Sequence, residues 1–380
     1  MKKSSGIKVA MIGQKHVLSR EGGIEIVVRN LSERLVKHGF TVTCFDRSGG
    51  HVSGKKFAIE QNNPFSKVRI RQIPCIHAKG LSALTSSFIG TIMIAFGNYD
   101  LVHLHGEGIC SFISFFKLFG KKTIVTVHGL DYRRAKWGKI GRFVIHHAEK
   151  SAVKHADRII VLNSSTKQYF MDTYGKETVC IPNGIDPFRI IDDKAVFDRY
   201  GLKKNSYILF LSRLVPEKNP DLLIRAFKKV KADKKLVIAG GSSDSDAYVK
   251  SLHGIAENSG NVIFTGFVEG EMLASLFSNA YLYVLPSELE GMPISLLEAM
   301  SYGNCCLVSD IEECSSVVED HGVTFRCNDE NDLRNQLQKL LDHPETVDEY
   351  RRNAAAYIQK KYSWEKMTEE TIKVYQEVLS

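Results

Sequence analysis

Residues 281–300 read YLYVLPSELEGMPISLLEAM. The first five residues form a continuously apolar run, as in a strand that is buried on both faces of a parallel sheet. Pro293 suits the first turn of a helix, where its missing N–H is no loss. The stretch therefore predicts a strand, a loop and a helix, which is the repeating unit of an α/β fold.

The same alternation extends outward in both directions. Short apolar runs are separated by helical patterns such as residues 24–38 and 140–155, which favours parallel sheets covered by helices on both faces. The predicted strands are 7–13, 41–45, 68–73, 101–105, 123–127, 158–162 and 178–181 in the first half, and 207–211, 235–239, 261–265, 281–285, 305–308 and 323–325 in the second.

The alternation is interrupted once, at residues 182–187, where two prolines and a glycine favour a turn-rich connection. A chain of 380 residues is long enough for two cores. We predict an N-terminal Rossmann-like domain over 1–182 and a C-terminal one over 183–362. Residues 363–380 have helical spacing and no strand after them, so this helix is a candidate to pack back on the first domain.

Composition narrows the class of protein. The eight cysteines are scattered and have no zinc-type spacing, which favours buried thiols in a reducing compartment. No apolar leader follows the first six residues, so a cytoplasmic location is expected. The apolar stretch 81–97 is too short and too polar to span a membrane, and we predict a buried helix there.

The charge is divided unevenly along the chain. Residues 1–190 contain 29 Lys and Arg against 13 Asp and Glu, whereas residues 191–380 contain 22 against 30. A basic first half indicates an anionic partner. A phospholipid surface, a lipid pyrophosphate and a nucleic acid are the alternatives at this point.

Two loops of the second half contain charged residues at predicted strand ends. Arg213 and Lys218 lie on a proline-containing loop after strand 207–211, where two cations suit a diphosphate. Glu290 lies in the loop before the helix that begins near Pro293, and Glu298 on the second turn of that helix. Carboxylates in these places suit the vicinal hydroxyls of a sugar. Solvated surface side chains are the alternative for all four.

The first half has its own candidates. Gly22 and Gly23 join the first predicted strand to a helix whose free N–H groups suit an anion, although a plain turn would need the same glycines. His128 follows strand 123–127, where ligands of open α/β sheets bind. A histidine satisfied within its loop is the alternative.

A basic tract follows His128. Together with Glu25 beside the glycine pair, it is assigned to the acceptor or membrane side, since interleaved basic and aromatic residues suit an anionic bilayer. Stacking on nucleic acid and a merely solvated face are the alternatives. The residues concerned are Asp131, Arg133, Arg134, Lys136 and Trp137, with Lys139 and Arg142 beyond them.

The triplet Asp244-Ser245-Asp246 has the D-x-D form that some sugar-transferring enzymes use to hold a metal. Here it precedes a predicted helix, and an N-cap explains both carboxylates. No metal and no cofactor are therefore expected.

These motifs resemble, over nearly the whole chain, the retaining glycosyltransferases of family 4, whose hallmark is two glutamates separated by seven residues. Glu290 and Glu298 have this spacing. The surrounding matches are Pro182–Asp186, Ser212-Arg213-Leu214 with Lys218, Ala239-Gly240-Gly241, Thr265-Gly266-Phe267 and Pro286-Ser287, and the first half resembles the members of the family that build capsular or exopolysaccharide.

The resemblance implies a GT-B fold, in which two Rossmann-like domains face each other across a cleft. It implies that Glu298 holds the ribose of a nucleotide diphosphate sugar and that Arg213 and Lys218 bind the diphosphate. Glu290 and the backbone after it would contact the donor sugar, and His128 would lie near the reacting carbon. The other implied donor-binding residues are Gly22, Gly23, Phe267, Val268, Gly291, Met292, Pro293 and Ile294.

The sequence thus predicts a retaining transferase that moves a hexosyl-type residue from a nucleotide sugar to a glycan or a polyprenyl-diphosphate-linked saccharide. Cell-surface polysaccharide synthesis is the expected setting. The predicted location is cytoplasmic, with the inner face of the membrane as a candidate docking surface, and no nucleic acid is expected as a partner. A nucleotide-sugar epimerase, a phosphorylase and a non-catalytic sugar- or nucleotide-binding protein are the alternatives.

Overall fold

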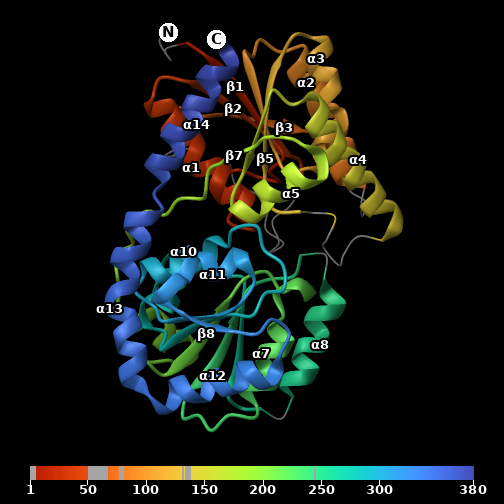
Figure 1. The fold of residues 1–380 in the computed structure, drawn as a ribbon. Helices are drawn as coiled ribbons and strands as arrows, with labels where there is room; N and C mark the ends of the chain where they lie inside the picture. The colour runs from red at the N-terminus through yellow and green to blue at the C-terminus, as the bar shows by residue number, and fades with distance from the viewer. Residues whose placement is uncertain are drawn as a thin grey trace. The chain divides into compact units, whose positions relative to one another are not determined.

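The computed structural model describes residues 6–49, 67–76, 81–130, 132, 138–243, 245–257 and 259–380. The chain divides into two compact units (Figure 1). Unit 1 comprises Met1–Gly184 and Trp364–Ser380, and unit 2 comprises Ile185–Ser363. The boundary predicted between residues 182 and 183 lies close to this division, and helix 363–380 belongs almost entirely to unit 1.

Unit 1 is built on a parallel seven-stranded sheet in the order β3-β2-β1-β4-β5-β6-β7. The central strands are almost entirely buried because helices cover both faces, and their side chains are mostly apolar. The strands are β1 Lys8–Ile12, β2 Thr41–Arg47, β3 Arg69–Ile73, β4 Leu101–His105, β5 Lys122–Val127, β6 Arg158–Val161 and β7 Val179–Cys180.

Two groups of helices flank this sheet (Figure 1). Helix α14 packs against α1 and β5, so the end of the chain completes the core of unit 1. On the other side, α2 packs against α3 and α3 against α4. The helices of the unit are α1 Gly23–Lys37, α2 Leu81–Ala95, α3 Ile113–Leu118, α4 Lys139–His155, α5 Ser164–Tyr174 and α14 Trp364–Leu379, with a short 3-10 helix η1 Gly108–Phe112.

Unit 2 has a parallel six-stranded sheet in the order β10-β9-β8-β11-β12-β13. Its strands are β8 Tyr207–Leu211, β9 Lys235–Ala239, β10 Val262–Gly266, β11 Leu282–Leu285, β12 Cys306–Ser309 and β13 Val323–Phe325. Its helices are α6 Lys194–Tyr200, α7 Pro220–Phe227, α8 Asp246–Ala256, α9 Gly270–Asn279, α10 Ile294–Ser301, α11 Glu312–Val318, α12 Glu330–Asp342 and α13 Pro344–Lys361, with the 3-10 turns η3 Pro216–Lys218 and η4 Glu319–His321.

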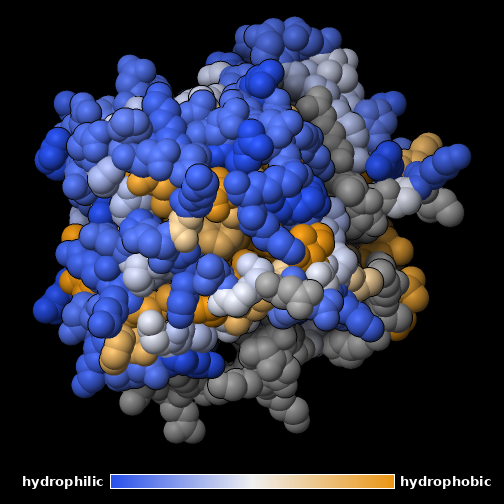
Figure 2. All heavy atoms as spheres, turned by 90° about the horizontal axis from the view of Figure 1, so that it is seen from below, coloured by the Kyte–Doolittle hydropathy of each residue, from blue (hydrophilic) through white to orange (hydrophobic). Residues whose placement is uncertain are grey.

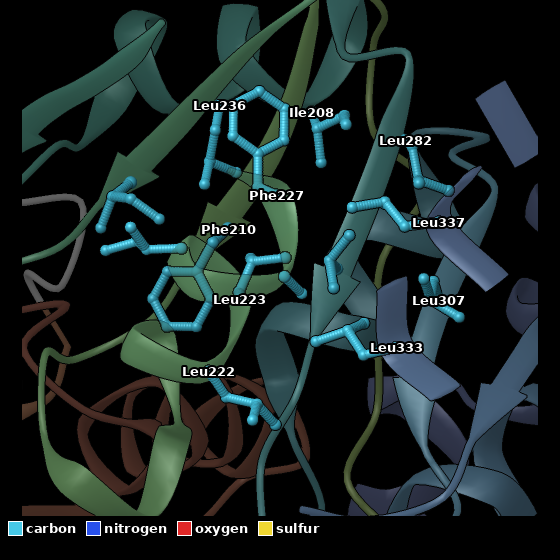
Figure 3. Packing of buried hydrophobic residues seen from close by; sticks show 14 of the residues in the cluster. Ile208, Phe210, Leu222, Leu223, Phe227, Leu236, Leu282, Leu307, Leu333 and Leu337 are labelled. Atoms are coloured by element: carbon cyan, nitrogen blue, oxygen red, sulfur yellow. The ribbon is translucent and has the colours of Figure 1, made fainter. Parts of the chain in front are cut away.

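One hydrophobic core of unit 2 joins its sheet to α7, α8 and α12. Ile208 and Phe210 of β8 point toward Leu223 and Phe227 of α7 (Figure 3). Leu337 of α12 closes the same cluster beside the strands. This core fixes the position of the loop between β8 and α7.

All thirteen predicted strands are present, and their ends differ by at most two residues from the predicted ones. The two Rossmann-like α/β units are therefore confirmed. Pro293 is the N-cap of α10 and not its first residue, because the preceding loop is extended up to that point.

The prediction of a buried helix at residues 81–97 is correct about the helix and wrong about its burial. Helix α2 forms, but Leu84 and Phe88 are exposed, whereas Ser86, Gly90 and Thr91 are buried. The reason is close packing: a Cβ on Gly90 would lie 2.5 Å from the Ile12 side chain. Small residues therefore face the sheet. Among the described helices, none is long and apolar enough to cross a membrane.

Candidate active site

Both sheets reverse their strand order once, between β1 and β4 in unit 1 and between β8 and β11 in unit 2. Loops at the carboxyl ends of the strands diverge at such a point, which is where open α/β sheets bind ligands. The predicted site residues lie largely at these two edges.

In unit 2 the structure joins two of the predicted catalytic residues. Lys218 and Glu290 form an ion pair between the loop after β8 and the loop after β11. The loops are also joined by their backbones, since the N–H of Glu288 donates to the carbonyl of Glu217 at 3.0 Å. Because the side chains of Lys218 and Glu290 are only 11% and 6% exposed, the pair lies in a largely dry environment. Such a pair interacts strongly.

The turn η3 determines where Lys218 lies. Val215 is extended, Pro216 begins the turn, and Asn219 ends it with a φ of 50°. Asparagine tolerates a left-handed φ better than most residues do, and its side-chain amide here donates to the Asn328 side chain at 2.6 Å. The chain thus reverses at Asn219 and holds Lys218 against the sheet.

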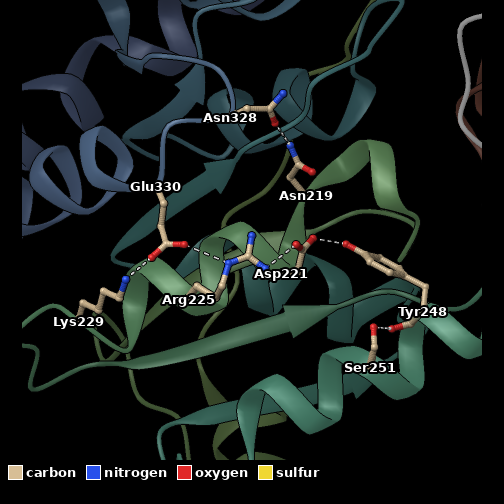
Figure 4. Close-up of polar contacts among 8 residues, drawn as sticks. All are labelled: Asn219, Asp221, Arg225, Lys229, Tyr248, Ser251, Asn328 and Glu330. Carbon is tan, nitrogen blue, oxygen red and sulfur yellow. Dashed lines mark hydrogen bonds and ion pairs between the residues drawn. The ribbon is translucent and has the colours of Figure 1, made fainter.

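Polar contacts behind this turn hold α7 to its neighbours (Figure 4). Asp221 accepts from Arg225 at 2.8 Å and also from the hydroxyl of Tyr248 on α8. Arg225 donates to Glu330 of α12 at 3.0 Å. These residues are partly exposed, so their contribution lies in the placement of α7 and not in stability.

A glycine allows the loops after β8 and β9 to touch. Gly240 has a φ of +150°, and a Cβ on it would lie 1.8 Å from the carbonyl oxygen of Ser212. The backbone of Leu214 then donates to the carbonyl of Gly241 at 3.0 Å. Arg213, half-buried, lies between these anchor points.

The second glutamate of the pair with seven intervening residues, Glu298, lies in α10 and is 3% exposed. Met292, Pro293 and Ile294 are also buried, and Gly291 is half-buried in the connection from β11 to α10. A buried carboxylate is costly unless it has polar partners. Its burial on the second turn of α10 is therefore unlike the position of an ordinary surface glutamate.

Phe267 and Val268 follow β10, the outermost strand of the sheet. Val268 is buried and Phe267 half-buried. The N–H of Gly240 donates to the carbonyl of Gly266 at 2.9 Å, which links this segment to the loop after β9. The residues thus lie at the same edge as Lys218, two strands away.

The sequence did not point to Tyr283, which connects the parts of this edge. Its buried hydroxyl donates to the carbonyl of Leu211 at 3.2 Å, and the hydroxyl oxygen of Ser295 lies 2.9 Å from the same phenol oxygen. It therefore joins the end of β8 to the start of α10. Burial raises the pKa of this phenol well above its usual value, so it stays a neutral donor. In the sequence Tyr283 is only one residue of the apolar run that predicts β11, so nothing marked its hydroxyl as a link.

In unit 1, Gly22 is the N-cap of α1 and Gly23 its first residue. Glu25, on the first turn, is buried and accepts the N–H of Lys15 at 2.8 Å. This carboxylate thus holds the loop after β1 against the helix that begins at Gly23.

His128, half-buried, lies beside two fully buried imidazoles of β4. His105 Nδ1 lies 3.1 Å from His128 Nε2. His103, on the same face of β4, lies 2.7 Å from the hydroxyl of Tyr375 on α14 and 2.7 Å from that of Thr126. The alternation His103-Leu104-His105 was a signal for this set, because side chains two residues apart on a strand share a face.

Burial keeps the two strand histidines neutral. It lowers the pKa of His103 to about 3 and that of His105 well below its usual range, and the neighbouring imidazoles act in the same direction. A neutral imidazole has one N–H and one acceptor nitrogen. The set can therefore orient His128 without carrying charge.

Asp46, near the carboxyl end of β2, is a further buried group that the sequence did not indicate. It accepts from Gln14 at 3.1 Å and from the backbone of Val17 at 3.0 Å. Burial raises its pKa to about 7. This carboxyl thus fixes the loop that leads from β1 to the glycine pair.

Some predicted residues lie outside the described part of the chain: Asp131, Arg133, Arg134, Lys136, Trp137 and Asp244. Lys139 and Arg142 are exposed on the first turn of α4. Asp246 is the first residue of α8 and Ser245 its N-cap. Within the described residues, no cluster of three or more metal-ligating side chains occurs.

Comparisons with known families agree with this arrangement. Residues 192–359 match the family described as glycosyl transferases group 1. Residues 21–189 match glycosyltransferase family 4. The chain is a glycosyltransferase.

Curated relatives agree with this assignment, and a solved structure shares the fold. An uncharacterized glycosyltransferase of Methanocaldococcus jannaschii is 25% identical over 94% of this chain and 95% of its own. The UDP-Gal:alpha-D-GlcNAc-diphosphoundecaprenol alpha-1,3-galactosyltransferase of Escherichia coli is 28% identical over 64% of this glycosyltransferase and 67% of that protein. The structure of Anabaena HepE in complex with UDP-glucose matches 98% of the chain and 100% of its own, with a TM-score of 0.82 at 16% identity. The glycosyltransferase thus has the GT-B type of fold.

Proposed function

We propose that this glycosyltransferase moves a hexosyl-type residue from a nucleotide diphosphate sugar to a glycan or lipid-linked saccharide with retention of anomeric configuration. The observation that carries the proposal is the ion pair between Lys218 and Glu290 at the switch point of unit 2. A cation suited to phosphate and a carboxylate suited to sugar hydroxyls thus lie side by side before any donor binds, which supports the proposal.

The donor is assigned to unit 2. In the proposal, Lys218 and Arg213 bind the diphosphate and Glu290 accepts from hydroxyls of the transferred sugar. Glu298 accepts from the ribose hydroxyls, and the backbone N–H groups of Gly291, Met292 and Ile294 line the site, since Pro293 has none. The HepE structure, which holds UDP-glucose, supports a uridine diphosphate sugar as the first donor to test.

Retention is proposed to occur by displacement on one face of the sugar. The bond between the anomeric carbon and the diphosphate oxygen breaks, and the bond to the acceptor oxygen forms on the same face. A phosphate oxygen of the leaving group takes the proton of the acceptor hydroxyl. Arg213 and Lys218 stabilise the charge that grows on the diphosphate, so no metal is required, and His128 is the residue of unit 1 that the proposal assigns to catalysis.

The acceptor is assigned to the edge of unit 1 that contains Gly22, Gly23 and His128. The E. coli relative, named for a diphosphoundecaprenol acceptor, supports a lipid-linked saccharide on the cytoplasmic face of a membrane. Capsule or exopolysaccharide assembly is the proposed setting.

The test is transfer of labelled sugar from a panel of UDP-sugars to polyprenyl-diphosphate-linked acceptors. Lys218→Ala and Arg213→Ala should each reduce kcat/KM by about 30- to 1000-fold, because one preorganised cation contributes about 2–4 kcal/mol in the transition state. Lys250→Ala, an exposed cation of α8, is the control and should leave the rate unchanged. Near wild-type rates for both loop variants would refute the assignment.

The same assay separates the alternatives. An epimerase would convert the donor without an acceptor, and a phosphorylase would need inorganic phosphate. A binding protein would retain the label on the donor. NMR of the product would show an inverted anomeric carbon if the retaining mechanism is wrong.

A further inference from the structure

Helix α2 presents apolar side chains to the solvent. The helix has no charged residue over its whole length. It packs on the sheet through small residues, since Gly90 lies against Ile12 and Ile73. Leu81, Leu84 and Phe88 are left outside, and Phe88 is 51% exposed. A surface helix of a soluble protein normally has the opposite orientation.

The exposed apolar residues continue onto the neighbouring helix. Phe96, just beyond α2 and 72% exposed, has its ring 4.8 Å from that of Phe119 beyond α3. The ring of Phe88 lies 5.5 Å from that of Phe112. We name this the α2–α3 surface; its residues are Leu81, Leu84, Phe88, Phe96, Leu118 and Phe119. Contiguous apolar patches of this kind mark interaction sites.

A cationic helix lies beside this surface. Helix α4 packs directly on α3 and on η1, as Figure 1 also shows. Its exposed residues include Lys139, Arg142, Lys150 and Lys154. They also include Phe143, which is 73% exposed.

The acidic residue of α4 does not offset these charges at the surface. Glu149 is fully buried. It accepts from the hydroxyl of Tyr169 at 2.8 Å and from that of Tyr174. The exposed face of α4 thus carries one sign of charge next to an apolar surface.

We propose that the α2–α3 surface and the exposed face of α4 together dock unit 1 on an anionic phospholipid bilayer. Leucine and phenylalanine side chains enter the boundary between headgroups and acyl chains, and the lysines and arginine of α4 contact anionic headgroups. Figure 2 shows the chain from below, where hydrophilic residues predominate and apolar residues form several patches among them.

Charge favours the bilayer over a second copy of the chain as the occupant. A two-fold contact through this surface would place one cationic α4 near another, and like charges brought together without water repel. An anionic bilayer instead complements both parts of the surface.

Docking on a bilayer adds a partner to the proposed function. Its benefit to the enzyme rests on that function, because a lipid-linked acceptor would lie in the same membrane. Its physical content is separate. Bilayer binding requires neither a donor nor catalysis.

The test is co-sedimentation of the full chain with vesicles of phosphatidylcholine alone or with about one third phosphatidylglycerol. Wild type should bind the anionic vesicles, and binding should weaken with added salt. Phe88→Ser with Leu118→Ser, and separately Arg142→Glu with Lys150→Glu, should each weaken binding by about tenfold or more.

Matched controls come from unit 2. Phe197→Ser removes a phenylalanine that is 47% exposed on α6, and Lys250→Glu with Lys339→Glu reverses two exposed cations. Both controls should bind vesicles as wild type does. Thermal unfolding and UDP binding of every variant confirm that the fold is intact.

Three results would overturn the proposal. Wild type could fail to bind either kind of vesicle, or the unit 2 controls could lose binding as fully as the unit 1 variants. Alternatively, light scattering could show a dimer that the Phe88→Ser variant separates, which would assign the surface to a second copy. Vesicle binding without sugar transfer would leave the docking surface standing and refute the proposed function alone.

Discussion

The two units have the same architecture, but the buried polar side chains at their strand ends are charged in unit 2 and neutral in unit 1. Unit 2 places a largely buried Lys218–Glu290 ion pair at its switch point, whereas unit 1 places buried, neutral imidazoles near its own. A diphosphate carries charge and an acceptor hydroxyl does not. The difference is the one expected if unit 2 holds the donor and unit 1 the acceptor.

The units also share one device. Gly13 in unit 1 and Gly240 in unit 2 both have positive φ and let the chain approach a neighbouring strand end. A Cβ would lie 2.0 Å from the carbonyl oxygen of His105 in the first case and 1.8 Å from that of Ser212 in the second. The shared glycines show that close approach of neighbouring backbone segments at the strand ends is a feature of the fold. The charged pair of unit 2 and the neutral imidazoles of unit 1 are what distinguishes the two units.

The largest effect is expected at the ion pair. Lys218→Ala leaves Glu290 buried without its cation and should destabilise unit 2 by about 3–5 kcal/mol. Adding Glu290→Gln should recover most of that loss, because no buried charge is left unpaired. Urea unfolding followed by far-UV circular dichroism measures the cycle. An additive double variant would show that the two residues are not coupled.

Replacing either of these two glycines should destabilise its unit nearly as much as loss of the ion pair destabilises unit 2. Gly13→Ala and Gly240→Ala should each cost about 2–4 kcal/mol, because alanine disfavours these φ angles and its Cβ meets a backbone oxygen. Gly254→Ala in α8 is the control, since nothing lies within 4 Å of its Cβ position. Residues 185–363 contain no tryptophan, so tryptophan fluorescence should detect the Gly13 variant and not the Gly240 variant.

Acid should weaken unit 1 before unit 2. The pKa values of His103 and His105 are lowered, so their stabilisation is present above about pH 6.5 and is lost as the pH falls. The raised pKa of Asp46 acts in the opposite direction over the same range. Two histidines against one carboxyl leave a net loss of about 1.4 kcal/mol per pH unit between pH 6.5 and 4.5.

Removing Asp46 tests the sign of this balance. Asp46→Asn should double the slope to about 2.7 kcal/mol per pH unit, because the opposing proton uptake disappears. Chemical unfolding followed by tryptophan fluorescence, at half-unit steps of pH, measures it. A stability of unit 1 that does not change over this range would show that the imidazoles are not held neutral. In unit 2 the lowered pKa values of Glu319 and Glu330 act only below about pH 4.5.

The smallest effects are expected at two buried tyrosines. Tyr375→Phe removes the hydroxyl partner of His103, and Tyr283→Phe removes the link between β8 and α10. Each should cost about 1–1.5 kcal/mol, as for a single hydrogen bond. Only Tyr283→Phe should also weaken donor binding, because only it lies at the proposed donor edge. Thermal unfolding and UDP titration of both variants measure these effects, and equal losses of UDP affinity would contradict the comparison.

Much of this fold could be predicted because continuously apolar strands alternate with helices along the whole chain. The approach of Lys218 to Glu290 was predictable as well, since strands that enclose a switch point bring their loops together. The histidine set was not predicted, because His103 lies within an apolar strand and its partner Tyr375 is 272 residues away. The exposed side of α2 was missed for a physical reason: close packing through Gly90, and not hydrophobicity, decides which face meets the sheet.

The division of labour between the units is tested most directly by calorimetric titration of UDP into wild type, Glu298→Gln and His128→Ala. Glu298→Gln should weaken binding by roughly 10- to 150-fold, since hydrogen bonds to a charged group contribute about 1.5–3 kcal/mol. His128→Ala should change the affinity by less than about twofold and lose sugar transfer. Wild-type affinity in Glu298→Gln, or equal loss in both variants, would contradict the assignment of the donor to unit 2.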